Sequence, residues 1–384
     1  MKSIQLVDTQ LWDQLNPITL TKTCADIRLG IFTIREKWQN LNQTTTILSR
    51  PYLQALYENS ESAQLKVNSA LLPNQSILRE ILNLGEGESI YQNEIWIATN
   101  GDEKVKNQAK GECHLLCHPE DLFIHAGSEI KKDIKNLVGN NNWIKPSLSN
   151  TIIGEEDVFL SEGTKMECCI LNTEEGPIYI GPNAHIMEGT IIRGPVSIGH
   201  NTILKMGARI YMNTSIGPWC KVGGEVKNSV ILGNSNKAHD GYMGNSVIGE
   251  WCNWGADTNN SNMKNNYTNV KLWDYSLNTF RNTGLQFVGL IMGDHSKTGI
   301  NTMFNTGTVM GVSCNIYGTG FPRKFIPSFS WGGVHGFKTY QLNRALDTAK
   351  AVQKRREIDL PKAEVEMLNE NFTRSSKYRK WEKL

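Results

Sequence analysis

Aliphatic residues recur at every sixth position through the middle of the chain. The unbroken run is Ile180, Ile186, Ile192, Ile198, Leu204, Ile210, Ile216 and Val222. Four positions after each stands a small or β-branched residue: Ala184, Thr190, Val196, Thr202, Ala208, Thr214, Cys220 and Val226. Each six-residue unit fits a short strand plus a turn, and three units close one coil of a parallel β-helix. The pattern predicts aliphatic side chains stacked inside the coils and small residues at the corners, whereas a β-sandwich would show period two.

The six-residue pattern is interrupted twice. It breaks over residues 225–244 and again over residues 259–289. The pattern returns at Tyr242, at the end of the first break, then at Ile248 and Trp254, and after the second break at Met292, Thr298, Phe304, Met310 and Ile316. Glycine marks the same region, because 26 of the 34 glycines lie between residues 150 and 335, a density typical of tight turns. Since repeat interiors are structural, we expect the chemistry at the interruptions.

The regions on either side of the repeat follow other patterns. Residues 1–147 alternate apolar runs with helical periodicity, which indicates an α/β domain; strands are expected at 4–7, 45–48, 64–67 and 94–98 and a helix at 30–41. After residue 336, apolar side chains fall at helical spacing at Leu342, Leu346, Ala349 and Val352, and Pro361 opens a second helical stretch. We therefore expect an α/β domain over 1–147, a β-helix over 148–335 and a helical tail over 336–384.

Composition narrows the possible functions. The 384 residues carry 40 basic and 38 acidic side chains, and this balance does not favour nucleic-acid binding. With 39% hydrophobic and 20% charged residues, and no run of about 18 apolar ones, neither a disordered nor a membrane protein is expected. The eight cysteines show no CxxC spacing, which speaks against a zinc site or a disulfide scaffold. The sequence predicts a soluble, cytoplasmic protein that binds neither nucleic acid nor membrane.

The hexapeptide repeat resembles the left-handed β-helix of the hexapeptide acyltransferase superfamily, over residues 150–333. Members of that superfamily usually assemble as trimers and bind acyl-CoA and its acceptor in clefts between neighbouring subunits. The resemblance therefore implies left-handed coils and a homotrimer. It specifies the fold more closely than the activity, because nucleotidyltransferases also carry such helices without acyl transfer.

The first interruption holds residue types suited to catalysis. Glu225-Val226-Lys227 is followed by Lys237-Ala238-His239-Asp240-Gly241-Tyr242, and the next units bring Asn253 and Ala256. This constellation resembles the acetyltransferase half of the bifunctional bacterial enzyme that makes UDP-N-acetylglucosamine. The chain has one residue fewer before the histidine, Asp257 where that family has glycine, and Lys205 where it has a phosphate-binding arginine.

The resemblance implies roles for the matching residues. His239 would be the general base that removes the ammonium proton of an amino sugar, with Glu225 fixing its tautomer. Lys205, Lys227, Tyr242 and Asn253 would bind the sugar phosphate, and Ala256, Arg323 and Lys324 would contact acetyl-CoA. The alternatives are His295 as the base, and an ordinary solvated loop for Arg323 and Lys324.

The front of the chain carries a second resemblance. LNPITLTKT at 15–23 and ADIRLGIFTIREKW at 25–38 resemble the N-terminus of a divergent, Bacteroidetes-type group of sugar nucleotidyltransferases, a variant of the same bifunctional enzyme. NSALLP at 68–73, PEDLF at 119–123 and residues 307–333 extend the match over essentially the whole chain. The glycine-rich G-x-G-T-R-M loop is absent, and Lys22-Thr23 replaces the Arg-Pro of the divergent group. Lys22, Arg28 and Lys37 are the candidates for nucleotide binding, and a solvated or structural role is the alternative for each. Mg²⁺ is a candidate cofactor, although no carboxylates can be named as its ligands.

The leading hypothesis is a bifunctional sugar-phosphate enzyme. It would acetylate glucosamine 1-phosphate with acetyl-CoA and then couple the product to UTP with release of pyrophosphate. One alternative keeps a single activity, either nucleotidyl transfer with an assembling β-helix or acyl transfer with a degenerate front domain. Another is a non-catalytic trimeric scaffold or sugar-nucleotide sensor. The sequence does not specify the sugar, the nucleotide base or the acyl group.

Overall fold

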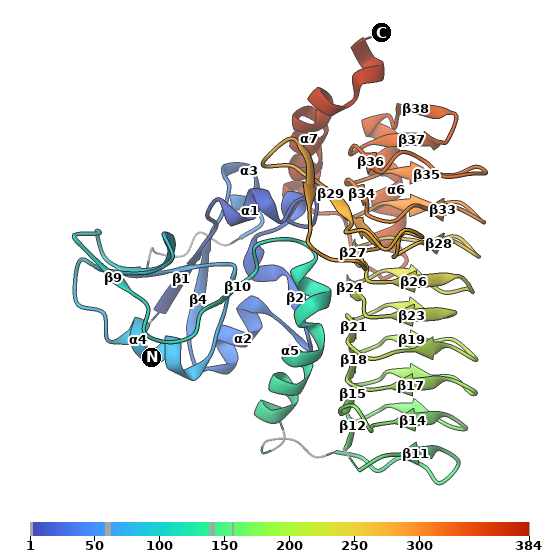
Figure 1. Cartoon of the computed structure of the whole chain (residues 1–384), viewed down its shortest axis with the longest axis horizontal. Coiled ribbons are helices and arrows are strands. Elements are labelled where there is room, and N and C mark those ends of the chain that lie inside the picture. Colours follow the sequence, from blue (N-terminus) through green and yellow to red (C-terminus); the bar gives the residue numbers. More distant parts are fainter. Residues whose placement is uncertain (1–2, 58–62, 138, 140–142, 156, 384) are drawn as a thin grey trace.

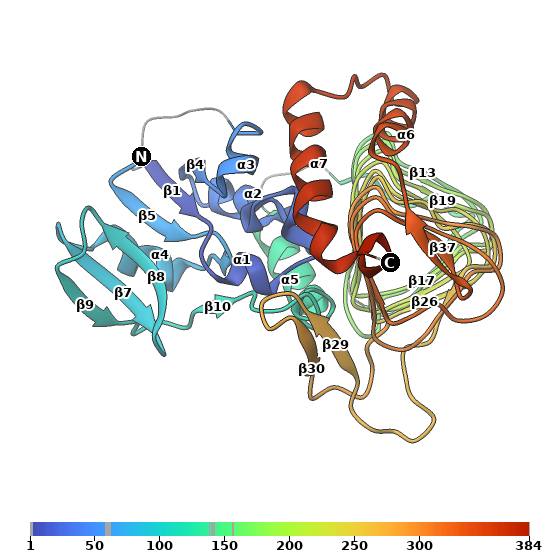
Figure 2. The ribbon, with the colours of Figure 1, turned by 90° about the horizontal axis from the view of Figure 1, so that it is seen from above.

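The structure, a computed structural model, describes residues 3–57, 63–137, 139, 143–155 and 157–383. An α/β domain, here called the front domain, stands beside a parallel β-helix, and C-terminal helices connect the two (Figures 1 and 2). The expected fold, an α/β domain followed by a left-handed β-helix and a helical tail, is confirmed.

The front domain is built on a mixed sheet with the strand order β4-β1-β5-β8-β7-β9. Its strands are β1 (Ser3–Val7), β4 (Thr44–Leu48), β5 (Leu65–Asn68), β7 (Glu88–Gln92), β8 (Ile95–Asn100) and β9 (Val105–Gln108). β1 lies between β4 and β5 and is parallel to both, while β8 is antiparallel to β5 and β7. The strands expected from the apolar runs are thus confirmed as β1, β4, β5 and β8.

Helices and short turns pack around this sheet. They are α1 (Leu11–Gln14), α2 (Ile34–Asn40), α3 (Pro51–Gln54), α4 (Gln75–Leu82), α5 (Asp121–Leu137) and the 3-10 turns η1 (Ile18–Thr21) and η2 (Cys24–Asp26); β6 (Leu71–Leu72) pairs with β10 (His114–Leu115). α2 begins later than the helix expected at 30–41, because β2 (Arg28–Leu29) and β3 (Phe32–Thr33) form a hairpin first. Gly30 turns this hairpin at a φ of +78°, and a Cβ there would lie 2.6 Å from the Asp133 carboxylate.

The β-helix is a prism of about 13 turns. Strands line each of its three sides, in one continuous sheet on the inner face and in two sheets on each of the others (Figure 1). The inner face, which packs on the front domain, comprises β12 (Val158–Leu160), β15 (Ile178–Ile180), β18 (Val196–Ile198), β21 (Thr214–Ile216), β24 (Val230–Gly233), β27 (Val247–Glu250), β31 (Leu290–Met292), β34 (Thr308–Met310) and β36 (Phe325–Ile326). The α6 face comprises β13 (Lys165–Met166), β16 (His185–Ile186), β19 (Ile203–Leu204), β22 (Lys221–Val222), β25 (Asn236–Lys237), β32 (Lys297–Thr298), β35 (Asn315–Ile316), β37 (Ser330–Gly333) and β38 (Gly336–Thr339). The open face comprises β11 (Thr151–Ile153), β14 (Ile170–Asn172), β17 (Ile191–Arg193), β20 (Arg209–Ile210), β23 (Glu225–Lys227), β26 (Tyr242–Gly244), β28 (Asn259–Asn260) and β33 (Met303–Phe304).

The aliphatic run from Ile180 to Val222 fills the interior of the coils, where each side chain is at most 2% exposed. Two details of the expected repeat are corrected. Residues 225–244 do not interrupt it, because they form β23 to β26 and stay paired to the preceding coil. Ile216 pairs with Ile231, fifteen residues on, where Ile198 pairs with Ile216, eighteen residues on, so the shorter coil loses the six-residue phase. Tyr242 lies outward on the open face, and its neighbour Met243 is buried inside instead.

Part of the second interruption does leave the coil. β29 (Lys271–Asp274) and β30 (Thr279–Asn282) form an antiparallel hairpin that projects toward the front domain (Figure 2). Arg281 donates to the Glu120 carboxylate just before α5 at 2.6 Å and to Asp274 at 3.2 Å. The hairpin therefore ties the β-helix to the front domain.

The front domain and the inner face share one hydrophobic core. Val230, Leu232 and Ile291 of the inner face cluster with apolar residues of the front domain, and α5 runs beside β21. The hydroxyls of Ser197 and Ser215 both donate to the Gly30 carbonyl, at 3.1 and 2.6 Å. The two parts thus form one continuous packed body.

The C-terminal helices span this junction, as Figure 2 shows. α6 (Leu342–Lys354) lies beside the α6 face, and α7 (Lys362–Ser375) returns to the front domain, where the Asn371 amide donates to the Leu20 carbonyl at 2.8 Å. Arg374 of α7 lies over the ring of Tyr52, 4.8 Å from its centroid. Among the described helices, none combines the length and the apolar character that crossing a bilayer requires.

Candidate functional site

The parallel strands of the front domain end at one edge of the sheet. The chain passes from β1 to β4 on one side and then to β5 on the other, which makes this edge a topological switch point. Ligands of open α/β sheets bind at such points, outside the carboxyl ends of the strands. Asp8 follows β1 here, and its carboxylate accepts from the hydroxyls of Ser49 after β4 and Ser69 after β5, both at 2.5 Å. Asp8 therefore joins the ends of all three strands.

Asp8 also fixes the segment that crosses this edge. Its carboxylate accepts from the Thr23 hydroxyl at 2.8 Å and from the Cys24 amide at 3.0 Å. The Thr23 amide donates in turn to the Tyr57 hydroxyl at 2.9 Å. The polar segment that contains Thr23 and Cys24 thus crosses the edge of the sheet where a glycine-rich loop would be expected from the resemblance.

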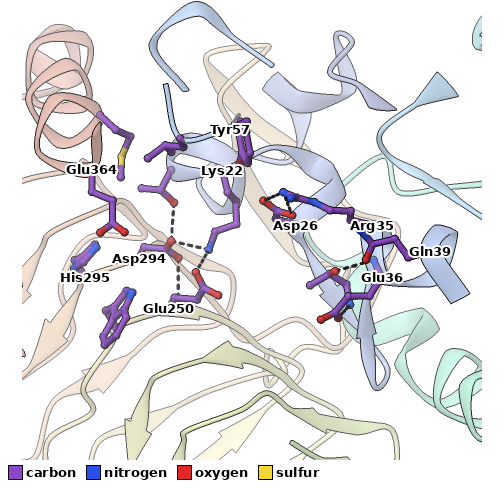
Figure 3. A pocket seen from close by; sticks show the side chains of 15 residues that line it. Lys22, Asp26, Arg35, Glu36, Gln39, Tyr57, Glu250, Asp294, His295 and Glu364 are labelled. Atoms are coloured by element: carbon purple, nitrogen blue, oxygen red, sulfur yellow. Dashed lines mark hydrogen bonds and ion pairs between the residues drawn. The ribbon is translucent and has the colours of Figure 1, made fainter. Parts of the chain in front are cut away.

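Behind this segment lies a cavity of about 560 Å³, here called the junction pocket (Figure 3). The front domain, the corner between the inner and α6 faces, and α7 all contribute to it. It is lined by Thr21, Lys22, Asp26, Thr33, Arg35, Glu36, Gln39, Leu56, Tyr57, Glu250, Trp251, Asp294, His295, Glu364 and Met367. The lining contains five carboxylates against one lysine and one arginine, so the pocket is acidic overall.

Lys22 links the front domain to the β-helix across this pocket. Its ammonium lies 2.8 Å from Glu250 and 2.7 Å from Asp294, and Asp294 also accepts from the Thr21 hydroxyl at 2.6 Å. Burial by itself lowers the pKa of Lys22, but the charges of Asp294 and Glu250 outweigh burial and raise that pKa above its usual value. Lys22 is therefore charged and already paired with two carboxylates.

Arg35 forms the opposite wall of the pocket, at the start of α2. Its guanidinium lies 2.5 Å from the Asp26 carboxylate and 5.3 Å from the centroid of the Tyr57 ring. Burial raises the pKa of Asp26, although the Arg35 charge opposes the shift. Because Arg35 keeps about a third of its side-chain surface exposed, at 29%, a ligand in the pocket can reach it.

His295 is buried at the far end of the pocket. Its side chain is 5% exposed, its ring stacks on Trp251 at a centroid distance of 6.5 Å, and its Nδ1 has no hydrogen-bond partner among the described residues. Burial lowers the pKa of His295 to about 3, so the ring is neutral at physiological pH. Glu364 of α7 lies across from it (Figure 3). His295 thus presents an unpaired ring nitrogen in a polar pocket.

The structure does not bring the three expected nucleotide-binding residues together. Lys22 lines the junction pocket. Arg28 is outside its lining, and its guanidinium donates to the Ile31 carbonyl and lies 3.3 Å from Glu36. Lys37 is buried under α5 and paired with Glu129 at 2.9 Å and Asp133 at 2.5 Å. Their roles stay predictions. Asp26 and Arg35, which the sequence reasoning did not single out, stand in the same ADIRLGIFTIREKW stretch.

A second candidate site lies on the corner between the α6 face and the open face, here called the His239 corner. It comprises Lys205, Ala238, His239 and Ala256, which follow α6-face positions in three coils, with the coil of Gly223 between those of Lys205 and Ala238. His239 is exposed in the turn between β25 and β26. Gly223 lies between Lys205 and Ala238 along this corner, because a Cβ on Gly223 would touch both residues.

The neighbouring open face carries the other expected acetyl-transfer residues. Tyr242 and Glu225 are cross-strand partners, and the Tyr242 hydroxyl accepts from the Asn262 amide at 3.0 Å. Lys227 lies over the Tyr211 ring, 5.9 Å from its centroid. Glu225 and Tyr242 begin their strands next to the His239 corner, whereas Lys227 lies at the other end of β23, toward the inner face.

Three expected residues lie elsewhere on the β-helix. Asn253 is exposed on the α6 face, bridged to Asn236 and Lys297. Arg323 and Lys324 precede β36 at the corner between the open and inner faces. Burial lowers the pKa of Lys324, and the charge of Lys264 lowers it further. A single chain does not join them to His239, and their roles stay predictions.

One comparison with known proteins finds a match in the front domain. Residues 4–141 match the model of a family described as sugar nucleotidyl transferase. The match covers the sheet, the segment across its carboxyl edge and α5, and it ends before β11. No curated protein matches the chain. Within the described residues, no group of three or more His, Cys, Asp or Glu side chains is arranged to hold a metal ion.

Proposed function

We propose that the protein is a sugar nucleotidyltransferase whose reaction takes place in the junction pocket. The observation that supports this most is that the matched segment ends its parallel strands at a switch point beside the pocket. In the proposed reaction an oxygen of a sugar 1-phosphate attacks the α-phosphorus of a nucleoside triphosphate. The bond between the α- and β-phosphates breaks, and pyrophosphate leaves with the electron pair.

Different residues of the junction pocket are candidates for binding the phosphates and the sugar. Arg35 is the candidate for the phosphates, since a guanidinium can hold two phosphate oxygens at once. Glu364 and His295 are candidates for sugar hydroxyls, because a carboxylate and a neutral ring nitrogen both accept hydrogen bonds. Lys22 holds the wall of the pocket in place through Glu250 and Asp294.

Mg²⁺ fits this pocket as a companion of the nucleotide. Mg²⁺ is commonly held by one or two carboxylates together with substrate phosphates, without a dedicated protein cage. Asp26 and Glu36 line the pocket near Arg35 and offer such carboxylates (Figure 3). When bound, the ion would neutralise phosphate charge that the acidic lining otherwise repels.

We further propose the specific reaction pair that the sequence suggests. UTP and N-acetylglucosamine 1-phosphate would be the substrates of the front domain. The His239 corner would acetylate glucosamine 1-phosphate with acetyl-CoA, and a cytoplasmic homotrimer would bring Arg323, Lys324 and Asn253 of neighbouring chains toward this corner. This part is supported by the position of Lys205, His239 and Ala256 along one corner of the β-helix, where His239 is exposed and the other two are half-buried.

One observation favours the alternative of acyl transfer with an inactive front domain. Lys22, an expected phosphate ligand, is already neutralised by two carboxylates. An assay of the purified full chain separates the possibilities. Pyrophosphate release is measured with UTP, other nucleoside triphosphates and a panel of sugar 1-phosphates, and free thiol release with acetyl-CoA and glucosamine 1-phosphate.

We expect pyrophosphate release that requires both substrates. Arg35→Met should lower kcat/KM for the nucleotide at least about tenfold, since each charged hydrogen bond to phosphate is worth about 1.5–3 kcal/mol. Arg79→Met, an exposed arginine of α4 away from the pocket, is the matched control and should leave the rate unchanged. Thiol release without any pyrophosphate release would support acyl transfer alone, and neither product would support a scaffold or sensor.

A further inference from the structure

A second cavity lies on the α6 face, beside the C-terminal end of α6. It has a volume of about 510 Å³ and is here called the α6 groove. Its cationic lining residues are Lys221, Lys297, Arg355 and Arg356, and two tryptophans, Trp219 and Trp251, complete its charged and aromatic lining. No aspartate or glutamate of the described chain is among the residues that line it. The groove therefore differs from the junction pocket in the sign of its charge.

The cations of the groove have no counter-charge. Within the described residues, none of the four forms an ion pair. The Lys297 ammonium donates to the carbonyls of His295 at 2.8 Å and Trp251 at 3.5 Å, and Arg356 donates to the Trp219 carbonyl at 2.6 Å. Burial lowers the pKa of Lys297 to about 8, and the effect of Cys252 opposes this only in part. Like charges gathered in one cavity repel each other, so an anion bound there would relieve the repulsion.

The neutral lining of the groove suits a planar, polar ring. The Trp219 side chain is 45% exposed, and the Arg356 guanidinium covers Trp251 at 5.3 Å from the ring centroid. Asparagines 201, 234, 236 and 253 also line the groove, and the Asn236 Oδ1 is buried without a hydrogen-bond partner among the described residues. Amide groups recognise the edges of nucleobases, and indole rings stack on their faces.

We propose that the α6 groove is a binding site for a nucleoside phosphate. Lys221, Lys297 and Arg355 would hold the phosphates, and Trp219 with the asparagine amides would hold the base. This site goes beyond the proposed transfer reaction and is separate from the junction pocket, although Trp251 lines both. The same chemistry is offered by a free nucleotide and by the adenosine phosphate end of coenzyme A.

Calorimetric titration of the full chain with UDP, ADP, coenzyme A and inorganic pyrophosphate tests the assignment. The test variant is Lys221→Ala with Arg355→Ala, because both side chains are exposed and their loss should not impair folding. The matched control is Lys165→Ala with Arg344→Ala. Lys165 lies on the same outward row of the α6 face through His185 and Ile203, and Arg344 is exposed on α6, but neither lines the groove.

We expect at least one nucleoside phosphate to bind, the test variant to weaken it at least about tenfold, and the control to change it less than about twofold. Tighter binding of coenzyme A than of ADP and UDP would identify the coenzyme as the source, and the reverse order a free nucleotide. The proposal would be overturned if pyrophosphate bound as tightly as the nucleoside phosphates, if the test variant kept the wild-type affinity, or if no probe bound. Pyrophosphate release by the same test variant reports separately on the junction pocket.

Discussion

Two buried lysines in different parts of the molecule have opposite surroundings. Lys22 at the domain junction and Lys237 inside the β-helix are 5% and 3% exposed. Lys22 contacts two carboxylates, and their charges raise its pKa despite burial. Lys237 pairs in register with Val222 at an interior position, and its ammonium donates only to the His239 carbonyl, at 2.7 Å, among the described residues. Burial lowers the pKa of Lys237 to about 8, and Asp240 opposes the shift in part.

The comparison separates a charge that holds the fold together from a charge that strains it. A buried cation between carboxylates becomes strongly destabilising only when its partner is removed. A buried cation without a carboxylate in contact costs stability in the native protein itself. Departures from a local rule of this kind are expected at functional sites. Lys237 supports the turn that carries His239, so the strain lies beside the proposed acetyl-transfer corner.

The largest effect should come from the residue that Lys237 supports. If His239 is the general base of acetyl transfer, His239→Ala should lower kcat by about 10²–10⁴-fold, the usual effect of a positioned base. Its melting temperature should stay close to that of the wild type, because the side chain is exposed. Thiol release and thermal unfolding measure the two quantities.

A matched variant is the control for this prediction. His185→Ala, on the α6 face, should leave turnover unchanged. If His295→Ala abolished acetyl transfer while His239→Ala stayed active, the base would be the buried histidine of the junction pocket and the corner assignment would be wrong.

Removing the junction lysine should have the next largest effect. Lys22→Met leaves Glu250 and Asp294 without their cation, and such a loss costs about 3–5 kcal/mol of unfolding free energy. Denaturant unfolding of the full chain measures it. The double variant Lys22→Met, Asp294→Asn should recover part of the loss, because the most buried carboxylate then carries no charge. An unchanged unfolding free energy in Lys22→Met would contradict the proposed role of this ion pair.

Lys237→Met should act in the opposite direction. The lowered pKa corresponds to a penalty for the charged form, so the variant should be more stable than the wild type by about 1–3 kcal/mol at pH 7. Below pH 8 the ammonium is charged in both the folded and unfolded states, and the penalty is full. Between about pH 8 and 10 the folded state loses its proton first, so the advantage of the variant should shrink as pH rises.

The pH dependence is measured as the difference in unfolding free energy between Lys237→Met and the wild type, so that other titrating groups cancel. Lys221→Met, an exposed neighbour on β22, is the control and should give no comparable gain. A destabilised Lys237→Met protein would show that the lysine is well solvated or paired in the coil and would remove the contrast with Lys22.

Much of the β-helix could be predicted because every coil repeats the same inward positions. The run from Ile180 to Val222 needs only its spacing to reveal the stacked interior. The coil at residues 225–244 does not follow the six-residue pattern because it is shorter than the others. Its strands nevertheless stay paired to the preceding coil, at Ile231 and Met243. Sequence periodicity shows the spacing of residues and not the pairing of strands, so a shortened coil looks like an interruption of the repeat.

The candidate sites differ in how far sequence could find them. Ala256 lies one coil after His239 and Lys205 lies two coils before it, so a known coil length places all three on one corner. The junction pocket joins Lys22, Glu250, Asp294 and Glu364, which come from distant segments that only the packing of three parts of the molecule brings together. No spacing rule connects such residues. The same holds for the α6 groove, where α6 returns to strands more than a hundred residues earlier.

The central claim is that the junction pocket is the nucleotidyl-transfer site. Hydrogen–deuterium exchange of the full chain, with and without UDP-N-acetylglucosamine and Mg²⁺, tests it most directly. The variant with Lys221→Ala and Arg355→Ala is used, so that the α6 groove contributes little. Our account predicts slower exchange in residues 21–26 and 33–39, with little change around His239. Slower exchange confined to other regions, or none at saturating ligand, would contradict it.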